Sequence, residues 1–262
     1  MKKLNILVCS MAAIGSMFIH TSCNDRWPCI HGSGPVISET RSISGFTEVS
    51  NEIEANVYIT EGAAFEVVIS GQQNILDNIE THVSGAELRI TTDHCIQDAD
   101  MVNIYITMPV VNALSLSGSG SLITQNAITT EQIDIDLSGS GAFVCNDTIH
   151  ASAISMDLSG SGNMQLIADA GTVDTDISGS GDVTITGNGN TFTYNMSGSG
   201  KMHAFYFYIA TAHVHMSGSG DMELNATDLI EGSISGSGDL YYKNTPAINV
   251  SFSGSGQLIH VN

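Results

Sequence analysis

The chain has 262 residues, of which 42% are apolar, and a formal net charge of −20. A surface this acidic repels phosphate backbones and anionic lipid headgroups, so we expect no nucleic-acid partner and no electrostatic binding to a membrane. The apolar fraction is high enough for one domain with a hydrophobic core of its own.

Residues 1–22 have the pattern of a bacterial lipoprotein signal peptide. Lys2 and Lys3 precede an apolar run, and small residues lead directly to Cys23. The run is too short for a comfortable transmembrane helix. The pattern predicts lipidation of Cys23, with palmitate among its acyl groups, and contact with the membrane through this lipid anchor alone. Because His20 stands where Leu is usual, a plain secretory signal is the alternative.

After the signal, residues 23–35 are short, polar and contain Gly and Pro, which is typical of a tether. From 36 to 116, alternating apolar and polar residues predict strands of irregular length, for example over 53–59 and 102–108. One helical turn is expected over 75–79. We expect 36–116 to form irregular coils that cap the repeats behind them, because an open end would leave backbone groups unpaired.

The rest of the chain, 117–262, is organised around the sequence Ser-Gly-Ser-Gly. It occurs eight times, at offsets of 18–21 residues. Before each copy, apolar and polar residues alternate, as Ile133, Ile135 and Leu137 alternate with aspartates, and a second short alternation follows each copy. Strict alternation indicates a strand with one buried face, and glycine permits the sharp corner. A repeat this short has no room for a crossover helix. We therefore predict a parallel β-helix in which successive repeats pair in register.

Several motifs together resemble a known family. They are Ile-Ser-Gly-Phe-Thr-Glu-Val from Ile43, Ala-Asn-Val-Tyr-Ile-Thr-Glu-Gly from Ala55, Ile-Tyr-Ile-Thr-Met-Pro from Ile104, and the repeated Leu-Ser-Gly-Ser-Gly. In this order they resemble the bacterial family described as putative autotransporter-adhesin head domains, the head GIN domain. The resemblance covers 36–262, which we take as one domain. It implies a right-handed β-helix and an envelope lipoprotein of Bacteroides-like bacteria, but no ligand and no catalytic residue.

One row of acidic side chains is a candidate metal site. In the predicted register, Asp136, Asp157 and Asp176 stand on three successive coils, roughly 4.8 Å apart. Their mutual repulsion could be offset by a calcium ion, which takes six to eight oxygen ligands. The alternative, which we favour, is a solvated acidic face that discourages aggregation. The three aspartates therefore remain candidates for a calcium site and are not assigned as one, and no other cofactor is predicted.

Two further patterns in the sequence contain residues that can bind metal ions. Acidic residues follow three of the corners, at Asp182, Asp221 and Asp239. They resemble the calcium-binding repeats of RTX toxins, but those repeats have a period of nine residues, about half the period here. His213 and His215 alternate on one strand, and His203 lies in the same repeat. Histidines spaced in this way can chelate zinc or copper. We favour exposed histidines that bind no metal.

Three cysteines remain after Cys23 in the predicted mature chain. Cys145 falls on an inward position and is predicted to be a buried free thiol. A bridge between Cys29 and Cys95 is compatible with an oxidising compartment, and the sequence leaves it open.

These observations favour a non-enzymatic, envelope-anchored binding or adhesion-like module that holds glycans or extracellular matrix proteins. The location would be the outer membrane, at the cell surface or on the periplasmic face. The alternative is a periplasmic structural or envelope-assembly protein. A polysaccharide-active β-helix enzyme is the third class, but the repeats lack the long loops that build a catalytic cleft. Because the last coil ends without cap residues, we also expect self-association.

Overall fold

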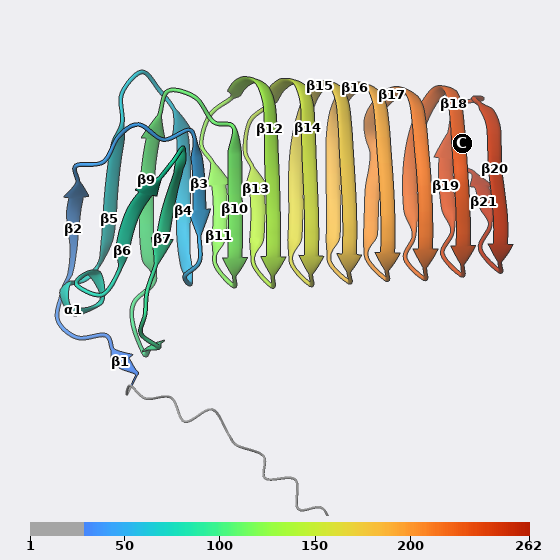
Figure 1. Ribbon diagram of the computed structural model, residues 1–262. Helices are drawn as coiled ribbons and strands as arrows, with labels where there is room; N and C mark the ends of the chain where they lie inside the picture. The colour runs from blue at the N-terminus through green and yellow to red at the C-terminus, as the bar shows by residue number, and fades with distance from the viewer. Residues whose placement is uncertain (1–28) are drawn as a thin grey trace, which may run out of the picture.

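The computed structural model describes residues 29–262, and 71% of the chain is in strands. The signal segment and Cys23 lie outside the described residues. The body is a solenoid of about seven turns. In Figure 1 the near strands from β10 (Ala113–Gly118) to β20 (Ala247–Gly254) point down, and the chain returns behind them as it advances to the right. This is a right-handed parallel β-helix, so the predicted fold class is confirmed.

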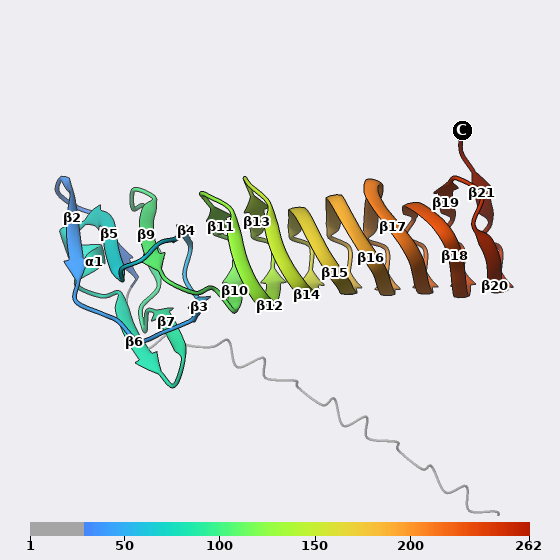
Figure 2. The same cartoon turned by 90° about the horizontal axis from the view of Figure 1, so that it is seen from above.

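The elements fall into an N-terminal cap and a repetitive body, seen from above in Figure 2. The cap contains β1 (Ile30–His31), β2 (Val36–Arg41), β3 (Glu48–Asn51), β4 (Ala55–Glu61), β5 (Glu66–Gln72), α1 (Gln73–Leu76), β6 (Glu80–Ser84), β7 (Glu87–Thr91), β8 (Ile96–Gln97) and β9 (Val102–Met108). The body contains β10, β11 (Ser121–Thr124), β12 (Ile128–Gly139), β13 (Ala142–Cys145), β14 (Ile149–Gly160), β15 (Asn163–Gly179), β16 (Asp182–Gly198), β17 (Lys201–Gly218), β18 (Met222–Gly236), β19 (Leu240–Lys243), β20 and β21 (Leu258–His260).

The cap ends the solenoid with antiparallel pairs. β2 and β9 flank β5 in antiparallel orientation, and β6 pairs with β7 in the same way. β3 and β4 join the cap to the body, because β3 pairs with both β7 and β10 and β4 pairs with both β9 and β11. The predicted helical turn is present as α1, which begins two residues earlier than expected.

The segment just before β2 is attached to the cap. A disulfide joins Cys29 to Cys95, and the adjoining β1 pairs in parallel with β8. Asn74 accepts a hydrogen bond from the amide of Ser33 at 3.0 Å and donates one to the carbonyl of His31 at 2.7 Å. Within the predicted tether, the described residues are therefore fixed to the fold by a covalent bond and by backbone contacts.

In the body the repeats stack in register, as predicted. The first serine of each Ser-Gly-Ser-Gly pairs with its copy in the next coil, from Ser117 to Ser253. The Ser138 and Ser117 hydroxyls lie 3.3 Å apart, and those of Ser255 and Ser237 lie 3.1 Å apart. Hydroxyl hydrogen bonds thus join the corner serines of adjacent coils at these two places, and the backbone pairing continues the stack along the solenoid axis.

The core is a set of apolar rows that run along this axis. The inward side chains of the strands before and after each corner are almost all buried, including the free thiol of Cys145. Thr175 interrupts one row between Met156 and Tyr194. The hydroxyl groups of Thr175 and Tyr194 are buried without a hydrogen-bond partner. Burial, with a smaller contribution from Asp182, raises the pKa of the Tyr194 phenol far above its ordinary value.

Candidate functional site

The acidic residues after the corners have a structural role. The carboxylate of Asp182 accepts a hydrogen bond from the backbone amide of Lys201 at 3.1 Å, one coil further on. Asp221 accepts one from the amide of Asp239 at 3.1 Å, and Asp239 accepts one from the amide of Gln257 at 2.9 Å. Each carboxylate therefore satisfies a donor at the next corner, where the ladder of backbone bonds is interrupted. These hydrogen bonds give the three carboxylates a structural role that needs no bound calcium.

The predicted row of aspartates is present on the outer face before the corner. Asp136 pairs in register with Asp157, which pairs with Asp176. Ser115 continues the row and donates a hydrogen bond to Asp136 at 3.3 Å. Partial burial raises the pKa of the Asp157 carboxyl, and the charges of Asp136 and Asp176 raise it further. Within residues 29–262, no group of three acidic, histidine or cysteine side chains has the geometry to hold a metal ion.

Two of the three histidines pair with acids on neighbouring coils, and the three side chains do not converge. His203 lies 3.2 Å from Glu223, whereas His213 lies 2.9 Å from Glu231. The third, His215, contacts the hydroxyl of Ser233 at 3.2 Å. These contacts are cross-strand pairs of the kind that stabilise a sheet. The structure does not bring the three histidines together as a chelating set: His203 and His213 are partly buried, and His215 is exposed.

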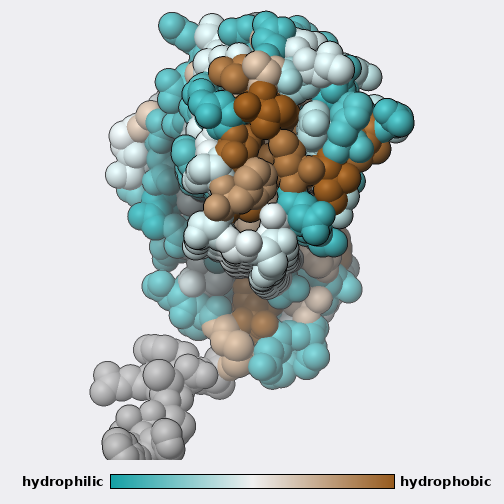
Figure 3. Space-filling model, turned by 90° about the vertical axis from the view of Figure 1, so that its right-hand side faces the viewer, coloured by the Kyte–Doolittle hydropathy of each residue, from teal (hydrophilic) through white to brown (hydrophobic). Residues whose placement is uncertain are grey.

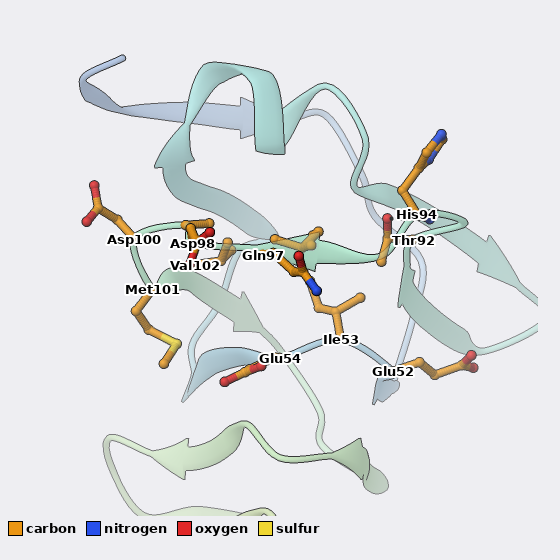
Figure 4. Close-up of a pocket in the computed structure, with 12 residues that line it drawn as sticks. Glu52, Ile53, Glu54, Thr92, His94, Gln97, Asp98, Asp100, Met101 and Val102 are labelled. Atoms are coloured by element: carbon orange, nitrogen blue, oxygen red, sulfur yellow. Dashed lines mark hydrogen bonds between the residues drawn. The ribbon is translucent and has the colours of Figure 1, made fainter. Parts of the chain in front are cut away.

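The cap contains a pocket of about 380 Å³ between the start of β4 and the disulfide-bonded loop over 92–102. Figure 4 shows Ile53 and Gln97 approaching each other across this pocket, while Glu52 and Asp100 point away from it. Two of the rim carboxylates already have partners: Glu52 forms an ion pair with Arg89, and Asp98 lies 3.0 Å from His31. The pocket is therefore polar, and the negative charge of Glu52 at its rim is neutralised by Arg89.

A different kind of surface is found on β17. Tyr206 and Tyr208 point outward and are 68% and 54% exposed. The ammonium group of Lys243 lies 4.6 Å from the ring centre of Phe205 and 5.4 Å from that of Tyr206. On the preceding coil, Asn188 is the exposed neighbour of Tyr208. Aromatic faces beside amide and ammonium groups can stack on a ligand and donate hydrogen bonds to it at the same time.

Sequence reasoning did not single out these aromatic residues. The segment Phe205-Tyr206-Phe207-Tyr208 has aromatic side chains on both faces, so alternation alone does not say which pair is buried. The register also shifts between Thr184 and Thr186 in the pairing of β16 with β17. The shift places the ring of Phe207 in the core and turns the two tyrosines outward.

The fold and these surfaces define a capped, right-handed β-solenoid that presents long rows of exposed side chains. The family model described as "Putative auto-transporter adhesin, head GIN domain" matches residues 45–144 and, a second time, residues 133–246. The chain belongs to this family, so the resemblance found in the sequence is confirmed. The family description is that of an adhesion-like protein of the cell surface or envelope, and neither it nor the names of the similar structures describe an enzyme.

Similar solved structures have the same fold. A putative lipid binding protein from Parabacteroides distasonis is 23% identical, with a TM-score of 0.86 over 90% of this chain and 100% of that one. A putative adhesin from the same organism is 22% identical, with a TM-score of 0.84 over 89% and 100%. A putative adhesin from Parabacteroides merdae is 17% identical, with a TM-score of 0.84 over 89% and 99%. A search of curated proteins found no match.

Proposed function

We propose that the chain is a non-enzymatic, envelope-anchored binding module of the adhesion type, which holds glycans or matrix proteins against the side of its solenoid. The observation that carries this proposal is the exposure of Tyr206 and Tyr208 on one face of β17. Large exposed apolar side chains that are gathered together, with polar groups around them, mark interaction sites. The two tyrosine rings leave most of their apolar area in contact with water, and a ligand that covers them would bury that area.

The surroundings of the two rings favour a carbohydrate. Asn188 lies beside Tyr208, and Asp169 and His150 extend the same exposed row over the two preceding coils. The aromatic faces would stack on the apolar faces of sugar rings, while the amide and carboxylate groups would bond the hydroxyls. Because the coils repeat at about 4.8 Å, the row presents regularly spaced contacts to an extended chain.

Binding to immobilised glycans and matrix proteins tests the ligand. We expect wild-type protein to be retained by at least one glycan, and the variant Y206A/Y208A to bind it at least tenfold more weakly. The matched control is Y105A, which removes an exposed tyrosine from the cap and should leave binding unchanged. If the wild-type protein is retained only by a matrix protein, the ligand is a protein and not a glycan. If no glycan or matrix protein is bound, or if the double variant binds as wild type does, the aromatic surface is not the ligand site.

The anchor and the location are tested separately. We expect mass spectrometry to find acyl chains on Cys23, and protease added to intact cells to remove the protein. Protection from the protease, with digestion only after lysis, would support the second candidate, a periplasmic structural or assembly protein. That candidate is favoured by the exposed apolar side chains of the last coil. Cleavage of a bound polysaccharide, abolished in D157N, would overturn the non-enzymatic part of the proposal.

A further inference from the structure

The two ends of the solenoid differ. The N-terminal end is closed by the antiparallel strands of the cap. At the other end, Figure 3 shows apolar residues across the middle of the face, with polar residues around them. The inward side chains of the last coil form this patch: Ile248 is 40% exposed and Phe252 is 44% exposed. Their equivalents one coil earlier, Ile230 and Ile234, are 0% and 2% exposed.

The outer edge of β20 is also open. Within residues 29–262, β20 pairs with β18 on one side and with no strand on the other. An edge strand of this kind leaves a row of backbone donors and acceptors without partners in the sheet and is a template for pairing with another strand. A strand that pairs here would satisfy those groups and cover the apolar side chains in the same step.

We propose that this occupant is β20 of a second copy, which pairs in antiparallel orientation about a twofold axis through Val250. Residues directly opposite each other in an antiparallel pair point to the same face of the sheet. With Val250 opposite Val250 of the partner subunit, Ile248 lies opposite the partner's Phe252, and Asn249 lies opposite the partner's Ser251. Apolar side chains then meet in the core and polar ones meet at the surface. A shift by one residue would set apolar side chains against polar ones.

Charge favours a second copy at this end over contact at the sides. Residues 244–262 contain no Asp, Glu, Lys or Arg, although the chain has a net charge of −20. Two copies that met side by side through the row of Asp136, Asp157 and Asp176 would oppose like charges. Pairing head to tail would set β20 against an outer strand of the cap, β2 or β6, and these strands carry the charged side chains Glu39, Arg41 and Glu80, which do not match the uncharged β20. An isologous contact also closes after two copies and does not grow into a fibre.

The oligomeric state tests the proposal. Size-exclusion chromatography with light scattering should give twice the chain mass for the wild-type protein at about 100 μM, a concentration well above a micromolar dissociation constant. V250D should shift the mass to that of one chain, because it would bury two carboxylates against each other at the axis. N190D adds the same charge at an exposed position on the side of the solenoid and should remain a dimer. A strict monomer for wild type, or a dimer for V250D, would overturn the proposal.

Cysteine cross-linking tests the register without relying on a charged substitution. V250C places two thiols at the axis, so mild oxidation should give a disulfide-linked dimer. I248C is an inward position on the same strand, but the two copies would be offset by about four residues, or roughly 13 Å, along the strands. It should remain unlinked. Equal cross-linking at both positions, or cross-linking only in I248C, would rule out this register. The result does not depend on whether the side of the solenoid binds a glycan.

Discussion

Gly179 lies so close to Gly160 of the preceding coil that a Cβ atom on Gly179 would be 2.1 Å from the carbonyl oxygen of Gly160. Gly179 also has a φ of 150°, a conformation that other residues rarely adopt. Contact and conformation therefore both require glycine at this corner. We expect G179A to lower the free energy of unfolding, measured by urea denaturation, by about 3 kcal/mol or more.

A second glycine separates the two causes. Gly85 has a φ of 65°, but a Cβ atom there would have nothing within 4 Å. G85A should therefore cost only the conformational strain, about 1–2 kcal/mol. If the two variants lost the same stability, close stacking of the coils would not be the reason for glycine at the corners.

Thr175 offers a stabilising change. Its side chain is fully buried, and its hydroxyl has no hydrogen-bond partner. Replacing the hydroxyl with a methyl group of similar size removes the cost of burying an unsatisfied polar group. T175V should raise the free energy of unfolding by roughly 1 kcal/mol. T193V, at an outward position on the next coil, should change it little. A loss of stability in T175V would show that the hydroxyl has a partner in solution.

Asp157 should make stability depend on pH. Burial and then the charges of Asp136 and Asp176 raise its pKa in the folded protein. Between the ordinary aspartate value, about 3.9, and the raised value, the folded state binds more protons than the unfolded state. The contribution of Asp157 to stability therefore falls as the pH rises through this window. D157N should be more stable than wild type at pH 7 by roughly 0.5 kcal/mol, and the difference should vanish below about pH 3.9.

The same variant tests the calcium alternative. D174N removes one charge from the neighbouring row and controls for the change in net charge. If calcium raised the melting temperature of wild type but not that of D157N, and D157N became the less stable protein in calcium, the row would be a cation site. Without such an effect, the row is the solvated acidic face that we favour.

The disulfide should stabilise the cap. It joins Cys29 to Cys95, which are 66 residues apart, and fixes β1 beside β8. The variant C29S/C95S should lose about 2–4 kcal/mol of stability in urea. Hydrogen exchange should quicken in β1 and β8 and stay slow in β14 to β17. Reductant should bring wild type to the same stability as the variant and leave the variant unchanged. An unaffected cap would show that the backbone pairing alone holds this segment.

The structure of the body could be predicted because the same pattern of strand, corner and strand recurs every 18–21 residues in the sequence. The corner and the strand before it repeat the same alternation in each coil, so the register that aligns Ser117 with Ser138 also aligns the corners of the later coils. The pairing of the cap could not be predicted in this way. Alternation is the same in parallel and antiparallel strands, so it did not indicate that β2 and β9 would flank β5 in antiparallel orientation. Those pairs are set by packing between segments that do not repeat.

Single residues in the cap also depart from the pattern. Asn51 aligns with Leu116, yet it is fully buried. Its side-chain amide donates a hydrogen bond to the carbonyl of Ile53 at 3.0 Å, which satisfies the polar group and shapes the turn into β4. Of the candidate site residues, the aspartate row could be placed from the period alone. The outward tyrosines could not, because their orientation depends on a local shift in register.

In-register stacking makes the coil the unit in which this molecule can change length. A whole repeat inserted into the body would add about 4.8 Å to the solenoid and leave both ends as they are, because every coil offers the next the same backbone edge. A single extra residue cannot be accommodated at the corner, where glycine is packed on glycine. An extra residue has to be placed in the segment between one corner and the next. This is the case between Ser197 and Ser217, which are 20 residues apart, whereas Ser178 and Ser197 are 19 apart. Relatives with longer or shorter solenoids can therefore arise by duplication or loss of whole coils, while the segments between the corners vary and change the surface.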